Sequence, residues 1–200
     1  MEEIIQFDSE GLMLEGLMEK KSVDKGVVVT HPHPLYGGDM YNNVVEWITN
    51  VYQSHGYTTL RFNFRGVGNS EGSHDNGMGE QKDVLSAIST LKDKGLKIVD
   101  LAGYSFGSWI NARVVSTETM VDRLIMVSPP VGFIDFDSIK ALTPLKLVVT
   151  GSMDDIAPAD IIMEKLTIWN KNALLEVIEG ADHFYSGYDK ELALILSSIL

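Results

Sequence analysis

Short apolar runs alternate along this sequence with stretches in which apolar residues recur every three or four positions. Each run is rich in Val, Leu or Ile and is soon followed by Gly, Pro, Ser or Asn, as is typical of strands buried on both faces. The predicted strands are Val27–Thr30, Thr58–Phe62, Ile98–Ala102, Arg123–Val127, Leu145–Thr150 and Ala173–Ile178. Because strands that alternate with helices are joined by right-handed crossovers, the pattern predicts an α/β fold with a mostly parallel sheet.

Two further patterns complete the predicted fold. At the start of the chain, Glu3–Phe7 and Leu12–Met18 flank Ser9-Glu10-Gly11 and predict an antiparallel hairpin at one sheet edge. Amphipathic helices are predicted from three apolar stripes: Val44, Trp47, Ile48 and Val51; Val84, Ala87, Ile88 and Leu91; Leu192, Ile195, Leu196 and Ile199. We expect residues 1–200 to form one domain, a three-layer sandwich that binds ligands beyond the carboxyl ends of its strands.

Composition narrows the range of partners. The chain has 200 residues, of which 44% are hydrophobic, enough to build the core of one domain. Its net charge of −12 repels phosphate backbones, so we expect no nucleic-acid partner. It has no cysteine, which excludes disulfides, thiolate metal sites and cysteine catalysis. No apolar run could span a bilayer and the acidic start is unlike a secretory signal, so we expect a cytoplasmic protein without a membrane partner.

The most informative motif is Gly103–Gly107, which reads Gly-Tyr-Ser-Phe-Gly. It follows the predicted strand Ile98–Ala102 and precedes a helix predicted through Trp109 and Val115. A tight strand-to-helix turn needs glycine at its flanks and projects the serine hydroxyl from the top of the sheet. The motif alone is a weak match, and the alternative interpretation is an ordinary Gly-rich strand-to-helix turn. Between a strand and a helix, it predicts that Ser105 is a nucleophile.

A serine nucleophile needs a base, and the base needs an acid to orient it. Two loops that follow predicted strands supply both: one carries Asp154 and the other carries His183. The order Ser, acid, His is that of one of the three common serine-hydrolase folds. Three other carboxylates compete for the acid role, namely Asp155, Asp135 and Asp137. We favour Asp154 because it comes first in the loop after its strand.

These motifs together resemble the α/β-hydrolase superfamily over nearly the whole chain. More narrowly, the sequence resembles small hydrolases without a cap domain that carry a His-Pro-His-Pro-Leu-Tyr-Gly-Gly loop and are related to dienelactone hydrolases and serine esterases. The matching stretches are His31–Gly38, Phe62–Gly68, Gly103–Gly107, Gly151–Pro158 and Gly180–Phe184. One departure is that dienelactone hydrolases use a cysteine nucleophile, which this chain lacks.

The resemblance implies an oxyanion hole, with one N–H from Phe106 and a second from the loop His31–Gly38. Pro32 and Pro34 have no N–H, so the second donor is His33 or Leu35, depending on the alignment, with Tyr36 a weaker third candidate. An alternative interpretation makes His31 and His33 a metal pair, but no carboxylates stand near them in a ligand pattern.

Several other residues have ordinary interpretations. The spacing around Phe64–Gly68 is one residue too long for a dinucleotide loop, and we expect Arg65 to form structural hydrogen bonds. The stretch Asn69–Gly79 is predicted to be a mobile surface loop that borders the site. Four aromatic residues are assigned by position: His55 and His74 to the surface, and Trp47 and Trp169 to the core or its boundary.

We expect a serine hydrolase, most simply a carboxylesterase, that needs neither cofactor nor metal and acts on small esters. A thioesterase, an amidase or a peptidase could use the same three residues, and a non-catalytic binding protein could keep the same fold. Only Ser128–Thr143 separates two predicted strands where larger relatives insert a lid, and a crossover helix is predicted there around Phe136–Leu142. The site should therefore be open and prefer short acyl groups.

Overall fold

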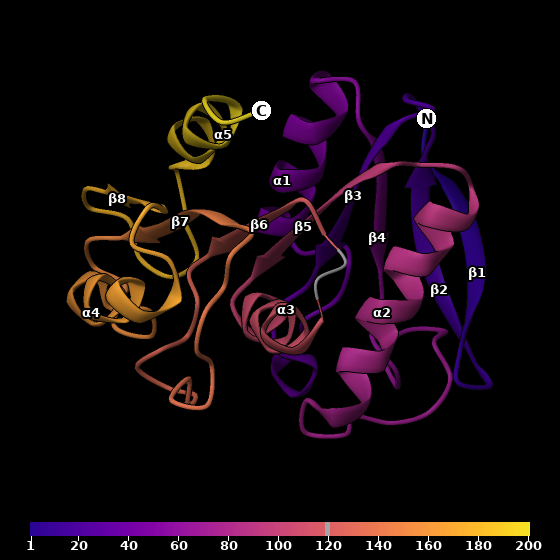
Figure 1. Ribbon diagram of the computed structural model, residues 1–200, viewed down its shortest axis with the longest axis horizontal. Helices are drawn as coiled ribbons and strands as arrows, with labels where there is room; N and C mark the ends of the chain where they lie inside the picture. Colours follow the sequence, from indigo (N-terminus) through magenta and orange to yellow (C-terminus); the bar gives the residue numbers. More distant parts are fainter. Residues whose placement is uncertain (119–120) are drawn as a thin grey trace.

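The computed structural model describes residues 1–118 and 121–200. Within these residues, eight strands form one sheet in the order β1-β2-β4-β3-β5-β6-β7-β8 (Figure 1). The hairpin β1–β2 joins β4 antiparallel, and every later pair is parallel. The strands are β1 (Glu3–Ser9), β2 (Leu12–Glu19), β3 (Lys25–Thr30), β4 (Thr58–Phe62), β5 (Ile98–Tyr104), β6 (Arg123–Val127), β7 (Leu145–Gly151) and β8 (Leu174–Ile178).

Helices cover both faces of the sheet and make the predicted three-layer sandwich (Figure 1). The helices are α1 (Asn43–Ser54), α2 (Met78–Asp93), α3 (Phe106–Thr117), α4 (Ala159–Trp169) and α5 (Asp189–Ser197). α1 and α5 bury their apolar stripes against one face, and α2, α3 and α4 pack on the other. Among the described residues, no helix is both long and apolar enough to cross a membrane.

The predicted strands and hairpin are confirmed, with small differences at their ends. The last strand differs in character, because β8 forms an edge of the sheet instead of lying buried between neighbours. Leu174 and Val177 are consequently exposed on it. An apolar run alone cannot separate an edge strand from a central one, since both can be rich in Leu and Val.

The crossover helix predicted around residues 136–142 is wrong. The segment between β6 and β7 consists of turns, although Phe136, Ile139 and Leu142 are buried in the core. Oδ1 of Asp135 accepts the N–H of Asp137 at 2.6 Å and closes a turn. Such side-chain bonds compete with the hydrogen bonds of a helix. Phe136 packs against α4, where its ring lies 5.4 Å from that of Trp169.

Candidate active site

The carboxyl ends of the parallel strands meet at one edge of the sheet, where the loops after β3, β5, β6, β7 and β8 come together. The strand register aligns these ends: Gly103 of β5 lies opposite Thr30 of β3, and Tyr104 lies opposite Val127 of β6. The loops that carry the predicted site residues are therefore brought to one place by the sheet itself.

Ser105 stands between β5 and α3 in a strained conformation, with φ 52° and ψ −120°. Its backbone N–H donates to the carbonyl of Val127 at 2.9 Å. A Cβ on Gly107 would lie 2.6 Å from Thr30 Oγ1, and one on Gly103 would lie 2.5 Å from the same atom. Both flanking positions therefore require glycine, for the reason that the sequence suggested.

Ser105, His183 and Asp154 form a hydrogen-bonded chain. Ser105 Oγ lies 3.0 Å from Nε2 of His183, and the Nδ1 of the same ring lies 2.9 and 2.8 Å from the two oxygens of Asp154. All three residues are buried, and Ser105 and His183 are each 8% exposed. Three loops that are far apart in the sequence thus bring the predicted nucleophile, base and acid within hydrogen-bond distance of one another.

Asp154 is held by more than His183. Its Oδ1 accepts the N–H groups of Ile156 and Ala157 at 3.0 and 2.8 Å, and its Oδ2 accepts the hydroxyl of Ser128 at 2.7 Å. Burial raises the pKa of Asp154, but the hydrogen bond and charge of His183, with the bonds from Ser128 and Ala157, outweigh it and leave the pKa below its ordinary value. The carboxylate is therefore ionised at neutral pH.

The three competing carboxylates lie away from His183 on the surface. Asp155 and Asp135 are exposed, and Asp137 forms an ion pair with Lys165 at 2.8 Å. Among the four candidate acids, only Asp154 is found in contact with the histidine within the described residues.

Further contacts hold Asp154 and His183 in place, and no pattern in the sequence indicated them. The hydroxyl of Tyr185 lies 2.7 Å from that of Ser128, which in turn donates to Asp154. Tyr104 donates its hydroxyl to the carbonyl of His183 at 2.8 Å. Ser128 and Tyr185 adopt positive φ angles of 46° and 55°, as Ser105 does. Such strain in residues other than glycine gathers where the fold must aim a side chain.

The loop after β3 contains the candidate oxyanion donors. Leu35 N–H donates to Nδ1 of His33 at 3.2 Å, and Tyr36 N–H donates to the His33 carbonyl at 3.1 Å. In the part of the chain that the structure describes, the N–H of His33 finds no acceptor. The N–H of Phe106 stands in the first turn of α3, where helical partners are lacking. Of the loop candidates, His33 is thus the one with a free N–H.

His31 and His33 have different environments, and neither resembles a metal ligand. The ring of His31 is fully buried: Nδ1 contacts the Pro32 carbonyl at 2.7 Å and Nε2 accepts the N–H of Phe64 at 3.0 Å. Burial lowers the pKa of His31 to about 4, so both nitrogens are used by a neutral ring. Burial and the nearby charge of His74 lower the pKa of His33, which keeps its Nδ1 available to Leu35. The described residues contain no cluster of three or more ligating side chains.

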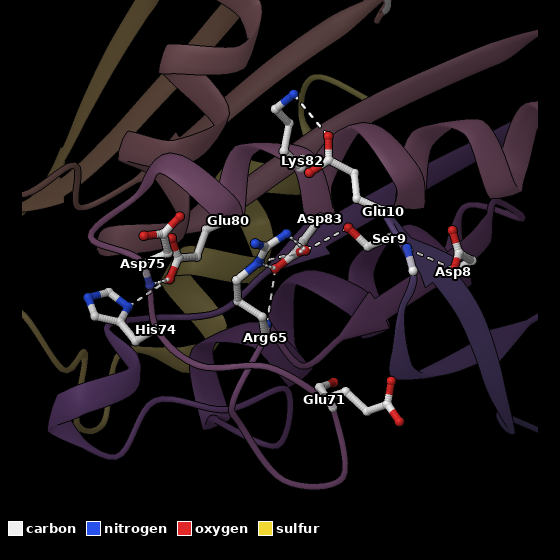
Figure 2. A network of polar contacts seen from close by, with 12 residues as sticks. Asp8, Ser9, Glu10, Arg65, Glu71, His74, Asp75, Glu80, Lys82 and Asp83 are labelled. Atoms are coloured by element: carbon white, nitrogen blue, oxygen red, sulfur yellow. Dashed lines mark hydrogen bonds and ion pairs between the residues drawn. The ribbon is translucent and has the colours of Figure 1, made fainter.

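Arg65 has the structural role that was expected. Its guanidinium donates to the buried carboxylate of Asp83 at 2.8 to 3.1 Å, and Ser9 of the hairpin donates to the same carboxylate at 2.7 Å (Figure 2). Trp169 is buried and Trp47 is partly buried against the core, as predicted.

The prediction that His74 is an ordinary surface histidine is wrong. Its side chain is 11% exposed, and its Nδ1 lies 2.7 Å from Oε1 of the fully buried Glu80 (Figure 2). The contact is close but not aligned as a hydrogen bond. The ring lies 5.1 Å from that of His33 and 5.7 Å from that of Phe106. Residues 69–79 therefore bring a partly buried histidine next to the rings of His33 and Phe106.

A cleft of about 460 Å³ opens above Ser105. Its walls are mainly apolar and aromatic, and within the described residues no Asp, Glu, Lys or Arg lines it. The lining residues are Pro32, His33, Tyr36, Gly37, Gly38, Asn42, Tyr104, Ser105, Phe106, Pro130, Phe133, Ile134, Ile156, His183 and Phe184. The loops after β3 and β6 form its rim, whereas residues of the stretch 69–79, which was expected to border the site, line a neighbouring hollow instead.

Similar proteins are found by sequence and by structure, although no protein-family model matches the chain. An uncharacterised protein of Rickettsia prowazekii is 33% identical over 183 residues, which span 86% of this chain and 77% of the relative. An α/β serine hydrolase homologue from Coxiella burnetii is 32% identical, with a TM-score of 0.90 over 99% of this chain and 97% of that one. XC6422 from Xanthomonas campestris, described as an α/β serine hydrolase without a lid, is 27% identical, with a TM-score of 0.89 over 98% and 92% of the two chains.

Proposed function

Because the chain belongs to the α/β serine hydrolase family, we propose that it hydrolyses carboxylic esters through an acyl-enzyme on Ser105. The observation that carries this proposal is the contact of a strained, glycine-flanked serine with a histidine whose other nitrogen meets a buried carboxylate. A serine hydroxyl is a weak nucleophile unless a neighbouring base takes its proton, and this arrangement supplies the base.

The proposed reaction has two halves. Ser105 Oγ attacks the ester carbonyl while Nε2 of His183 takes the hydroxyl proton, and the tetrahedral intermediate then expels the alcohol, which receives that proton from His183. Water attacks the acyl-enzyme in the same way and releases the acid. Asp154 holds His183 in the tautomer with the proton on Nδ1 and stabilises the charged ring that forms in each half.

The N–H groups of Phe106 and His33 are proposed to bind the oxyanion. His33 is preferred to Leu35 and Tyr36 because both of these residues already donate their N–H groups to atoms of His33. Such donors act mainly on the charge that develops in the tetrahedral intermediate, and one is typically worth ~3 kcal/mol.

We expect small substrates with short acyl groups of roughly two to six carbons, because the cleft is open and encloses little of a long chain. Each buried CH₂ group contributes only ~0.8 kcal/mol. The short connection between β6 and β7 leaves no chain for a lid there. Consequently we expect no jump in rate when the substrate passes into emulsion.

Labelling with a fluorophosphonate probe tests the proposal directly. The probe should label the protein, and Ser105→Ala should abolish labelling and lower kcat for a short ester by several orders of magnitude while the fold is kept. A folded Ser105→Ala protein with undiminished turnover would contradict the proposal. A second matched variant, Ser108→Ala, alters a buried serine one turn further along α3 and should still be labelled.

A further inference from the structure

Exposed aromatic side chains gather at the cleft. Among the described residues, four aromatic side chains are largely exposed: Tyr36 at 74%, Tyr41 at 52%, Phe133 at 63% and Phe184 at 65%. Three of these four, all except Tyr41, line the cleft above Ser105. Large apolar side chains that folding leaves in water and that gather at one rim mark a binding surface.

The backbone holds two of these rings in place. Tyr36 ends a short 3₁₀ turn, Pro34–Tyr36. His33 caps the start of this turn, and Gly37, with φ 80°, caps its end. Phe133 lies in a turn where its N–H donates to the Pro130 carbonyl at 3.0 Å. The two rings meet edge to face at 6.2 Å. They form a preformed wall, so little conformational entropy is lost when a ligand binds to it.

Phe184 lines the same cleft, beside His183. Its ring contacts that of His183 edge-on at 5.8 Å. In the proposed mechanism, His183 gives its proton to the departing alcohol. The alcohol group must therefore lie near the His183 ring, and so near Phe184. A short acyl group leaves most of the aromatic lining free for the alcohol part of the ester.

The charge pattern of the cleft limits the substrate further. No charged side chain from the described residues lines it, and the whole chain carries −12. A phosphate or carboxylate on the substrate would find no cation there and would be repelled by the protein as a whole. A cationic group would find no carboxylate in the lining.

We propose that the substrate is an uncharged ester of a short acid with an aromatic alcohol, whose ring lies against Phe184 and the Tyr36–Phe133 wall. This inference rests on the proposed function, since it uses the direction in which the alcohol leaves. The inference excludes coenzyme A thioesters as substrates, because their phosphates would need cationic side chains in the cleft.

Matched pairs of esters test the ring preference. Benzyl acetate and cyclohexylmethyl acetate share an acid and have alcohols of similar size, and benzyl acetate should have a kcat/KM three- to tenfold higher because aromatic pairs add to the gain from burial. Methyl phenylacetate and methyl cyclohexylacetate carry the ring on the acid and should differ little. Equal rates in the first pair, or a preference in the second pair alone, would overturn the inference.

Three variants locate the preference. Phe184→Leu and Phe133→Leu remove a ring but keep an apolar side chain, and each should reduce the benzyl preference. Tyr41→Leu removes the exposed ring that does not line the cleft and should leave it unchanged. A preference that survives in both phenylalanine variants would overturn the assignment of the ring to this wall.

Charged analogues test the second half of the inference. The anion 4-carboxybenzyl acetate should have a kcat/KM at least tenfold below that of benzyl acetate, and acetylcholine should not exceed its neutral isostere 3,3-dimethylbutyl acetate. Faster turnover of either charged ester would overturn the inference. Fluorophosphonate labelling in the same samples separates the two failures: loss of labelling contradicts the proposed function, whereas labelling without ring preference contradicts only the substrate class.

Discussion

Near the start of α3, the described residues include two histidines that each meet a buried carboxylate through Nδ1. One is His183 with Asp154, and the other is His74 with Glu80. The two pairs have almost the same burial, with histidine side chains 9% and 11% exposed and carboxylates fully buried. Burial and a carboxylate partner therefore do not distinguish the proposed base, His183, from His74.

The pairs differ in what surrounds them. His183 is hydrogen-bonded to Asp154 and has Ser105 Oγ at 3.0 Å from its second nitrogen. Glu80 instead accepts the N–H groups of Asp75 and Gly77 at 2.9 and 2.8 Å and so caps the start of α2, leaving its contact with His74 unaligned. Asp154 therefore orients a ring toward the proposed nucleophile, whereas Glu80 closes a loop.

The largest expected difference concerns activity. Asp154→Asn should lower kcat for a short ester about 10⁴-fold, because an amide in place of the carboxylate favours the wrong tautomer of His183. Glu80→Gln, the same chemical change in the other pair, should lower kcat less than about tenfold, since it removes no group from the reaction path. Initial rates with circular dichroism as a folding control measure both, and equal losses would show that His74 also takes part in catalysis.

A third histidine, His31, lacks a carboxylate and should respond to acid. Its pKa is about 4 in the folded protein against an ordinary value of 6.5, so below pH 6.5 the unfolded chain binds a proton that the folded one refuses. This contribution to the free energy of unfolding is complete above pH 6.5 and falls by about 3 kcal/mol as the pH drops to 4.

Urea unfolding of the wild type and His31→Gln between pH 7 and 4 measures this effect, and the variant should show the shallower loss of stability. If the variant does not fold, NMR titration of the His31 ring in the wild type provides the same test. A His31 ring that titrates near 6.5 in the folded protein would contradict the prediction.

The cap that Glu80 provides should appear in stability. Glu80→Ala removes the acceptor of two backbone N–H groups and should lower the free energy of unfolding by about 2 kcal/mol. The exposed Glu164 in the middle of α4 offers a control, and its change to alanine should stay within about 0.5 kcal/mol. Equal effects of the two substitutions in urea unfolding would show that Glu80 caps nothing.

The sequence predicted the pair His183–Asp154 but not the pair His74–Glu80, and the reason is physical. Ser105, Asp154 and His183 each follow a predicted strand, and the carboxyl ends of parallel strands must meet, so strand order alone brings them near one another. His74 lies in a Gly-, Asn- and Ser-rich stretch with no periodic pattern, and its burial depends on a loop path. The only local sign was Glu80, three residues after Gly77, a spacing typical of a helix start.

Other features depend on contacts that no local pattern encodes. The side chain of His33 accepts the N–H of Leu35 and so removes Leu35 as an oxyanion donor, whereas the sequence left both residues, with Tyr36, as alternatives. The crossover helix around Phe136–Leu142 was expected because parallel strands are usually joined through a helix, but the buried apolar residues of this connection lie in turns. The hydroxyl of Tyr185 contacts that of Ser128, 57 residues earlier in the sequence, and Ser128 in turn donates to Asp154.

The smallest expected effect comes from this last contact. Ser128→Ala removes one hydrogen bond that lowers the pKa of Asp154, so that pKa should rise and kcat should fall about fivefold, in line with ~1 kcal/mol for a buried hydrogen bond. Ser70→Ala is the matched control: this buried serine bonds the backbone of Asn63 and Glu15, so its loss should lower stability but leave kcat unchanged. An unchanged kcat in Ser128→Ala would mean that the N–H groups of Ile156 and Ala157 alone suffice to hold the carboxylate for His183.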